Sequence, residues 1–184
     1  MSEILEHVHR AADHLLQAGI RPGDRVACLS RNSEDATVLV LACWQLEATV
    51  VPLSTRYSAA MVQAAIKAMQ CTALVLSPSF EKPVSGIKVL HLERICSLGT
   101  NLFDAVRFDQ LGLDPDQEAS IILTSGSSGQ ARGVLHTIAN HLYSAQGAEQ
   151  VIPFGLADTW LVSLPMYHIS GFSLIMRALL HGAA

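Results

Sequence analysis

Residues 25–76, RVACLSRNSEDATVLVLACWQLEATVVPLSTRYSAAMVQAAIKAMQCTALVL, decide the fold class, because short apolar runs alternate in them with longer segments of helical spacing. The apolar runs predict buried strands at 25–29, 48–53 and 73–76. The segments between them predict helices at 34–45 and 58–69. Strand–helix–strand–helix–strand with short connections is typical of a parallel sheet flanked by helices, so we expect an α/β fold.

The flanking segments extend this pattern in both directions. Towards the amino terminus, apolar spacing predicts a helix at 3–17, and Asn32 or Ser33 is suited to cap the helix at 34–45. Beyond residue 76, a segment rich in proline and glycine contains one expected strand, at 87–90. Further on, the sequence predicts strands at 120–124 and 159–163, an apolar run at 134–137, and helices at 137–150 and 172–180.

The composition excludes several classes of protein. Half of the residues are apolar and 15% are charged, which argues against a disordered chain. The net charge is −4 without a basic block, so we expect no nucleic-acid partner. The most apolar stretch, 36–53, is interrupted by Gln45 and Glu47 and is too short and too polar to span a membrane. The four cysteines form no CxxC pair and no secretory signal is visible, so we expect a cytoplasmic protein with buried or partly buried thiols and no metal site.

Residues 124–133, TSGSSGQARG, form the most informative loop of the chain, with four hydroxyls, three glycines and one guanidinium. Glycines let a backbone approach a ligand closely, and successive N–H groups in such a loop form an anion-binding nest. The hydroxyls and Arg132 add donors suited to phosphate oxygens. A flexible Gly/Ser hairpin loop has the same composition, but apolar runs on both sides anchor this connection and favour a polyphosphate-binding loop.

Other glycine-loop motifs do not fit these residues. A Walker-type loop needs a lysine followed by Ser or Thr, a dinucleotide fingerprint needs G-x-G-x-x-G, and a nucleophile elbow needs G-x-S-x-G. The loop contains none of the three patterns. A serine hydrolase built on Ser127, His168 and Asp158 is therefore the weaker alternative.

The loop resembles the phosphate-binding motif of the adenylate-forming acid–CoA ligase family, T-S-G-[ST]-T-G-x-P-K-G. Ser128 keeps the hydroxyl of the motif, Ala131 replaces its proline and loosens the loop, and Arg132 keeps the charge of its lysine with a different geometry. A second segment, 164–171 (LPMYHISG), is similar to the family motif LP-[LM]-[FY]-H-x-x-G. Scaffold motifs of the family resemble residues 19–27 and 51–56, so the likeness covers nearly the whole chain.

The resemblance implies an enzyme that joins a carboxylic acid to coenzyme A with ATP, and Mg²⁺ bound to the nucleotide. The implied phosphate-binding residues are Thr124, Ser125, Gly126, Ser127, Ser128, Gly129 and Arg132. The implied acyl pocket contains Tyr167, His168 and Gly171, with His168 as the catalytic residue at the mouth of the carboxylate site. A longer string between residues 136 and 165 resembles the subfamily of menaquinone biosynthesis more specifically.

The resemblance also implies an organisation. We expect residues 1–118 to form a layered α/β sheet region, and 119–184 to add the phosphate-loop strand hairpin and the acyl-pocket segment of the same N-terminal domain. The family's C-terminal domain and its later adenine, ribose and lysine motifs are absent from these 184 residues, so we expect the chain alone to be inactive and to form homo-oligomers. The alternative is a non-catalytic nucleotide- or partner-binding module on the same scaffold, which Arg132 in place of lysine favours slightly.

Overall fold

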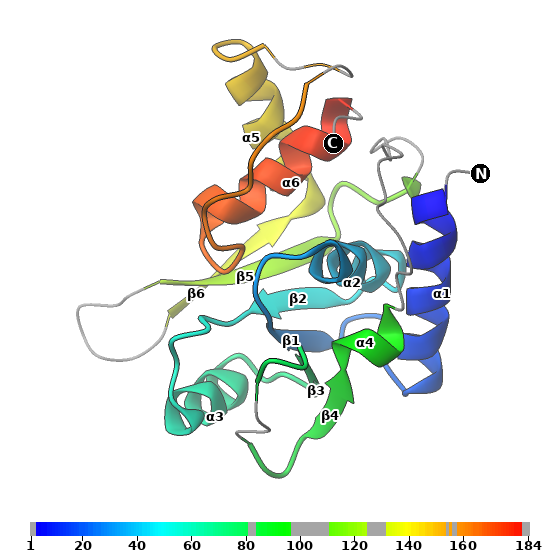
Figure 1. The fold of residues 1–184 in the computed structure, drawn as a ribbon, viewed down its shortest axis with the longest axis vertical. Coiled ribbons are helices and arrows are strands. Elements are labelled where there is room, and N and C mark those ends of the chain that lie inside the picture. Colours follow the sequence, from blue (N-terminus) through cyan, green and yellow to red (C-terminus); the bar gives the residue numbers. More distant parts are fainter. Residues whose placement is uncertain are drawn as a thin grey trace.

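The fold is built on a mixed sheet. The computed structural model describes residues 3–80, 84–96, 111–124, 132–153, 155 and 158–181. Its strands are β1 (Arg25–Leu29), β2 (Thr49–Pro52), β3 (Ala73–Leu76), β4 (Lys88–His91), β5 (Glu118–Thr124) and β6 (Arg132–Thr137). They lie in the order β4-β3-β1-β2-β5-β6, and neighbours are parallel except β5 and β6, which run antiparallel (Figure 1). This arrangement confirms the predicted α/β class with a parallel-rich sheet.

Except for one short helix at 92–95 that was not predicted, the helices lie close to the predicted positions. They are α1 (Glu3–Gln17), α2 (Glu34–Gln45), α3 (Ala59–Ala68), α4 (Leu92–Ile95), α5 (Ile138–Glu149) and α6 (Ile169–His181). Of the two candidate caps of α2, Ser33 is the N-cap, because its hydroxyl accepts a hydrogen bond from the Ala36 N–H at 3.1 Å. Thr137 caps α5 in a reciprocal capping box with Asn140. Local side-chain chemistry thus fixes where these helices begin.

Two apolar layers cover the sheet, one on each face. Val26 of β1 belongs to the layer that α1, α2, α4, α5 and α6 complete, whereas the next residue, Ala27, belongs to the layer that α3 covers. Trp44 of α2 is fully buried in the first layer and its indole N–H donates to the Ala119 carbonyl at 2.9 Å. Helix α2 is therefore anchored to β5, the strand that leads into the predicted phosphate loop.

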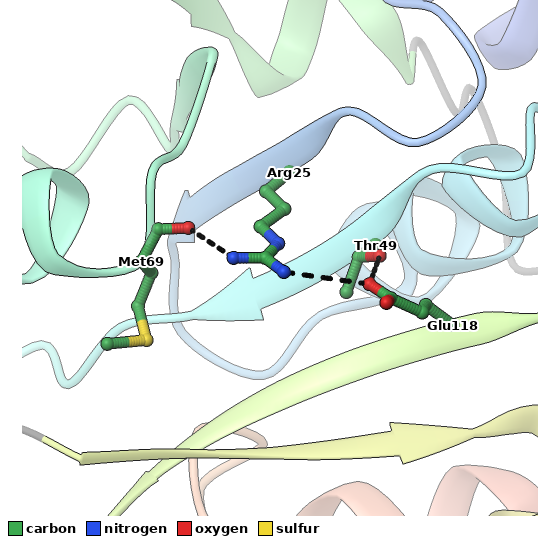
Figure 2. Close-up of polar contacts among 4 residues, drawn as sticks. All are labelled: Arg25, Thr49, Met69 and Glu118. Atoms are coloured by element: carbon green, nitrogen blue, oxygen red, sulfur yellow. Dashed lines mark hydrogen bonds and ion pairs between the residues drawn. The ribbon is translucent and has the colours of Figure 1, made fainter.

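A cluster of polar contacts links the amino ends of β1, β2 and β5 (Figure 2). Arg25 donates to the Met69 carbonyl at 3.2 Å, and its second terminal nitrogen lies 3.8 Å from a Glu118 carboxylate oxygen. The Thr49 hydroxyl donates to the same Glu118 oxygen at 3.3 Å. Because a partly exposed ion pair contributes only about 0–1 kcal/mol, the buried side chains of β2 and β5 supply most of the stability at this junction.

The predicted strand at 159–163 is wrong. The segment has no regular structure, Leu161 is 80% exposed, and the Ser163 N–H donates to the Leu161 carbonyl at 2.9 Å. A bond between residues two apart makes a tight turn that bends the chain. No strand of the described residues lies beside the segment to form a ladder, so apolar character alone did not make it a strand.

The cysteines fit the prediction of buried or partly buried thiols. Cys28, Cys43 and Cys96 are buried and Cys71 is half-buried, and all four are free thiols. Burial raises the pKa of Cys28 and of Cys71 to about 12, so both stay protonated at neutral pH. Within the described segments, no helix combines the length and the hydropathy needed to cross a membrane.

Candidate functional site

The candidate site lies at the carboxyl edge of the sheet. Strands β1 to β5 are parallel, so their carboxyl ends meet at one edge. The helix that follows β1 packs on one face of the sheet and the helix that follows β2 packs on the other. The two connections therefore part between β1 and β2 and leave a crevice, which is where open α/β sheets bind ligands.

The β5–β6 hairpin brings the two ends of the predicted phosphate loop together. Thr124 pairs directly with Arg132, and the Thr124 hydroxyl donates to the Arg132 carbonyl at 3.3 Å. Both residues are exposed, so the Arg132 guanidinium stands at the base of the loop where an anion from solvent can reach it, whereas the Thr124 hydroxyl proton is used by the Arg132 carbonyl. Five of the predicted phosphate-binding residues lie outside the described residues: Ser125, Gly126, Ser127, Ser128 and Gly129.

Gly133, the last glycine of the loop motif, is required by packing. It lies in β6, and a Cβ added to it would stand 2.4 Å from Ile121 Cγ2 and 2.5 Å from the Met69 sulfur. A side chain at this position would have to displace the side chains of Ile121 and Met69. The composition of the loop predicts glycines that let a ligand approach the backbone, whereas Gly133 permits close approach of two protein side chains.

Tyr167 fills the crevice at the carboxyl ends of β1 and β2. It is buried and lines a cavity of about 20 Å³ together with Cys28, Ser30, Leu53 and Met166 among others. His168 is exposed beside it, with the two ring centroids 4.7 Å apart. The predicted acyl-pocket pair thus consists of one aromatic ring inside the crevice and one imidazole outside it.

Gly171 allows the first turn of α6 to press against the preceding segment. A Cβ at this position would lie 2.3 Å from the Pro165 carbonyl oxygen and 2.5 Å from that of Leu164. The His168 N–H donates to the same Pro165 oxygen at 3.0 Å. Figure 1 shows the amino end of α6 and the carboxyl end of β5 directed towards the same edge of the sheet, so both predicted motifs belong to this edge.

Asn32, which the sequence predicts only as a possible helix cap, contributes contacts to the segment before α6. Its side-chain amide donates to the carbonyls of Val162 at 3.0 Å and Leu164 at 2.8 Å, and its oxygen accepts from the Met166 N–H at 2.9 Å. The signal in the sequence was the pair of cap-type residues, Asn32 and Ser33. Since one cap suffices for α2, the other residue is available for a different contact.

A buried histidine stands behind the hairpin. His141 of α5 is 2% exposed, its Nε2 lies 2.8 Å from the Ser120 hydroxyl of β5, and its ring stacks on His136 at 5.1 Å. Desolvation, with a smaller contribution from His136, lowers the pKa of His141 to about 4, so its imidazole is neutral at pH 7. Desolvation also lowers the pKa of His136.

A second hollow lies at the opposite edge of the sheet and does not fit the predicted chemistry. It encloses about 450 Å³ and is lined by His9, Asp13, Glu47, Asp114 and Gln117 among others. Three of these side chains are carboxylates, which repel phosphate groups. The amino-edge hollow is therefore no alternative to the carboxyl-edge site for a polyphosphate.

The comparison with known families identifies the class of protein to which this fold belongs. The whole chain, residues 1–184, matches the AMP-binding enzyme family, and the chain belongs to that family. Among curated relatives, a 2-succinylbenzoate–CoA ligase of Listeria innocua is 31% identical over 183 residues, and one of Bacillus pumilus is 27% identical over 181 residues. Each comparison covers 98% of this chain but 37% of the relative, so the chain spans little more than a third of these relatives.

Solved structures of one enzyme superpose closely on this fold. A double mutant of o-succinylbenzoate CoA synthetase (MenE) from Bacillus subtilis, bound with the product analogue OSB-NCoA, gives a TM-score of 0.85 at 25% identity, over 98% of this chain and 37% of that chain. The same enzyme in complex with ATP and magnesium ion gives a TM-score of 0.81 at 25% identity, over 98% of this chain and 48% of that chain.

Proposed function

We propose that the protein to which this chain belongs is an AMP-forming acid–CoA ligase whose acid is o-succinylbenzoate, in menaquinone biosynthesis. The observation that carries the proposal is the direct pairing of Thr124 and Arg132 at the base of a loop rich in hydroxyls and glycines, at the ligand-binding edge of the sheet. Membership of the AMP-binding enzyme family and the names of the relatives support it.

The proposed reaction has two steps, formation of an acyl-adenylate and transfer of the acyl group to coenzyme A. First, a carboxylate oxygen of the acid attacks the α-phosphorus of MgATP, and the bond from that phosphorus to the bridging oxygen breaks, so pyrophosphate leaves with the electron pair. Second, the sulfur of coenzyme A attacks the acyl carbon and loses its proton, and AMP leaves. Charge moves onto phosphate oxygens in the first step, so fixed donors around the polyphosphate are what the protein must supply.

The hairpin would supply those donors. The Arg132 guanidinium would bind β- and γ-phosphate oxygens, together with the hydroxyls of Ser125, Ser127 and Ser128. The Thr124 hydroxyl would join them by turning its proton from the Arg132 carbonyl to a phosphate oxygen. Gly126 and Gly129 would permit the backbone to approach the phosphates. These contacts hold the leaving pyrophosphate in place and offset its charge.

The segment before α6 would hold the acid. Tyr167 in the crevice and Gly171 at the start of α6 would shape the acyl pocket, and the exposed His168 would orient the carboxylate at its mouth. MgATP, the carboxylic acid and coenzyme A are the proposed ligands, and the cytoplasm, which supplies all three, is the proposed location.

Arginine variants test the proposal. In a protein that carries this chain and has ligase activity, we expect Arg132→Ala to lower o-succinylbenzoate-dependent exchange of pyrophosphate into ATP by about tenfold or more, since a charge-assisted contact to phosphate is worth roughly 1.5–3 kcal/mol. Arg132→Lys keeps the charge and should retain most of the exchange. Arg10→Ala, on the exposed surface of α1, is the matched control and should leave the exchange unchanged.

The same assay separates the alternative function. A non-catalytic nucleotide- or partner-binding module would show no acid-dependent exchange with any variant, yet Arg132→Ala would still weaken its ligand binding. We expect no turnover from the isolated 184-residue chain. Formation of o-succinylbenzoyl-CoA by that chain alone would contradict this expectation.

A further inference from the structure

Asn32 connects two segments of the carboxyl edge that are far apart in the sequence. It lies in the connection between β1 and α2, and its three partners lie between Val162 and Met166, ahead of the acyl-pocket pair. The two amide hydrogens donate to two carbonyls and the amide oxygen accepts one N–H. A side-chain amide is the only neutral group of this size that offers two donors and an acceptor together.

The segment that Asn32 binds has no regular secondary structure, and the Arg177 guanidinium of α6 lies over its Trp160 ring at 5.4 Å. Residues 159–163 form no ladder, and Leu161 is largely exposed. Asn32 therefore satisfies backbone groups that a neighbouring strand would satisfy in a sheet. Its bonds fix the path of the chain at Val162, Leu164 and Met166, on both sides of Pro165.

The fixed backbone leads directly to the predicted pocket. The Met166 N–H bound by Asn32 precedes Tyr167 in the chain, and the Pro165 carbonyl accepts from the His168 N–H at 3.0 Å. The first turn of α6 rests on the carbonyls of Leu164 and Pro165 through Gly171. A shift of this segment would move the phenol and the imidazole together.

We infer that Asn32 is the positioning residue of the acyl pocket: its amide, hydrogen-bonded to Val162, Leu164 and Met166, sets where Tyr167 and His168 meet the carboxylic acid. This inference rests on the proposed function for the role of the pocket, but the hydrogen bonds it invokes exist without substrate. Asn32 touches no reacting atom and acts through the backbone of the segment it binds.

Two variants of Asn32 and one neighbouring control test the inference in the full ligase. N32A removes all three bonds. N32D keeps the size and the acceptor but sets a carboxylate against two carbonyl oxygens. We expect both to raise the KM for the acid by about fivefold or more while the KM for ATP changes by less than about twofold, because only the acyl-pocket segment loses its contacts.

S33A is the control, because it removes the cap of α2 and costs a similar loss of stability beside the same residue. It should lower the melting temperature without raising the KM for the acid. If S33A and N32A raise that KM equally, general loosening of the connection explains the effect and the positioning role is wrong. An unchanged KM for the acid in N32D would also overturn the inference, because aspartate has the size of asparagine and keeps its packing but cannot donate the two hydrogen bonds.

Hydrogen exchange separates a failure of this inference from a failure of the proposed function. The amide of Met166 should exchange about fivefold faster or more in N32A than in the wild type or S33A, whatever reaction the protein catalyses. If exchange at Met166 is faster but the protein has no acid-dependent activity, Asn32 does position the segment and the proposed ligase function is wrong. Unchanged exchange at Met166 would overturn the inference even in an active ligase.

Discussion

At the residue scale, His141 makes the stability of the fold depend on pH. Its pKa is lowered to about 4 in the folded chain, whereas an unfolded histidine titrates near 6.5. Between about pH 4 and pH 6.5 the unfolded state binds more protons than the folded state. The free energy of unfolding therefore increases as the pH rises through this range and decreases as the pH falls through it. We expect His141 alone to remove about 2 kcal/mol between pH 7 and pH 5, measured by urea unfolding.

His141→Gln should flatten this pH dependence, although it also lowers stability at pH 7 through loss of the contact with Ser120. His9→Gln, at an exposed position of α1, is the control for replacing a histidine by glutamine away from His141. Equal slopes for the wild type and His141→Gln would show that His141 is not the group that titrates.

Single residues of the site differ in how far the sequence could predict them. Thr124 and Arg132 could be proposed as phosphate-binding residues because a hydroxyl- and glycine-rich loop has a recognisable composition. Asn32 was missed as a contact residue because its partners lie 130 to 134 positions away, and no local pattern encodes such a distance. The packing role of Gly133 was missed for the same reason, since Met69 is the residue that follows α3 and Ile121 comes from the neighbouring strand.

At the scale of elements, α6 depends on the missing side chain of Gly171. Gly171→Ala would place a Cβ against the carbonyls of Leu164 and Pro165, which belong to the backbone and cannot rotate away. We expect a loss of roughly 1–3 kcal/mol in the free energy of unfolding, typical of overpacking. Chemical denaturation followed by circular dichroism measures it.

Gly147 offers a matched control on the neighbouring helix α5. A Cβ there meets nothing within 4 Å, and Gly147 lies on the solvent-exposed side of α5, before the helix ends. Gly147→Ala should therefore raise stability by roughly 0.5–1 kcal/mol through helix propensity. The two alanine variants are expected to change stability in opposite directions, and a stabilising Gly171→Ala would refute the close contact.

Helices and strands could be predicted from the sequence where the apolar pattern and the residues at the ends of the segment indicate the same element. The bounds of β1, β3, α1 and α2 follow from apolar runs that end at glycine, proline or a cap residue. The segment 159–163 has the same apolar character as those strands, but a strand also needs a neighbour for its hydrogen bonds. The sequence of a single segment carries no information about whether that neighbour is present.

At the scale of the whole molecule, apolar side chains remain exposed around the segment before α6 and along β6. Val151 and Leu161 are each 80% exposed, and Ile152, Leu164 and Ile169 are exposed nearby in the chain. Strand β6 ends the sheet and exposes Val134 and Leu135. Exposed apolar surface and an unpaired strand edge both favour association between copies.

We therefore expect the 184-residue chain to self-associate, with a mass by static light scattering that rises with concentration. Leu161→Lys combined with Val151→Lys should reduce the association, because charges would have to lose their hydration in the contact. Met61→Lys is the control, since Met61 is exposed on α3 and belongs to neither apolar region. A monomer at high concentration, or equal suppression by Met61→Lys, would show that these apolar side chains do not drive contacts between copies.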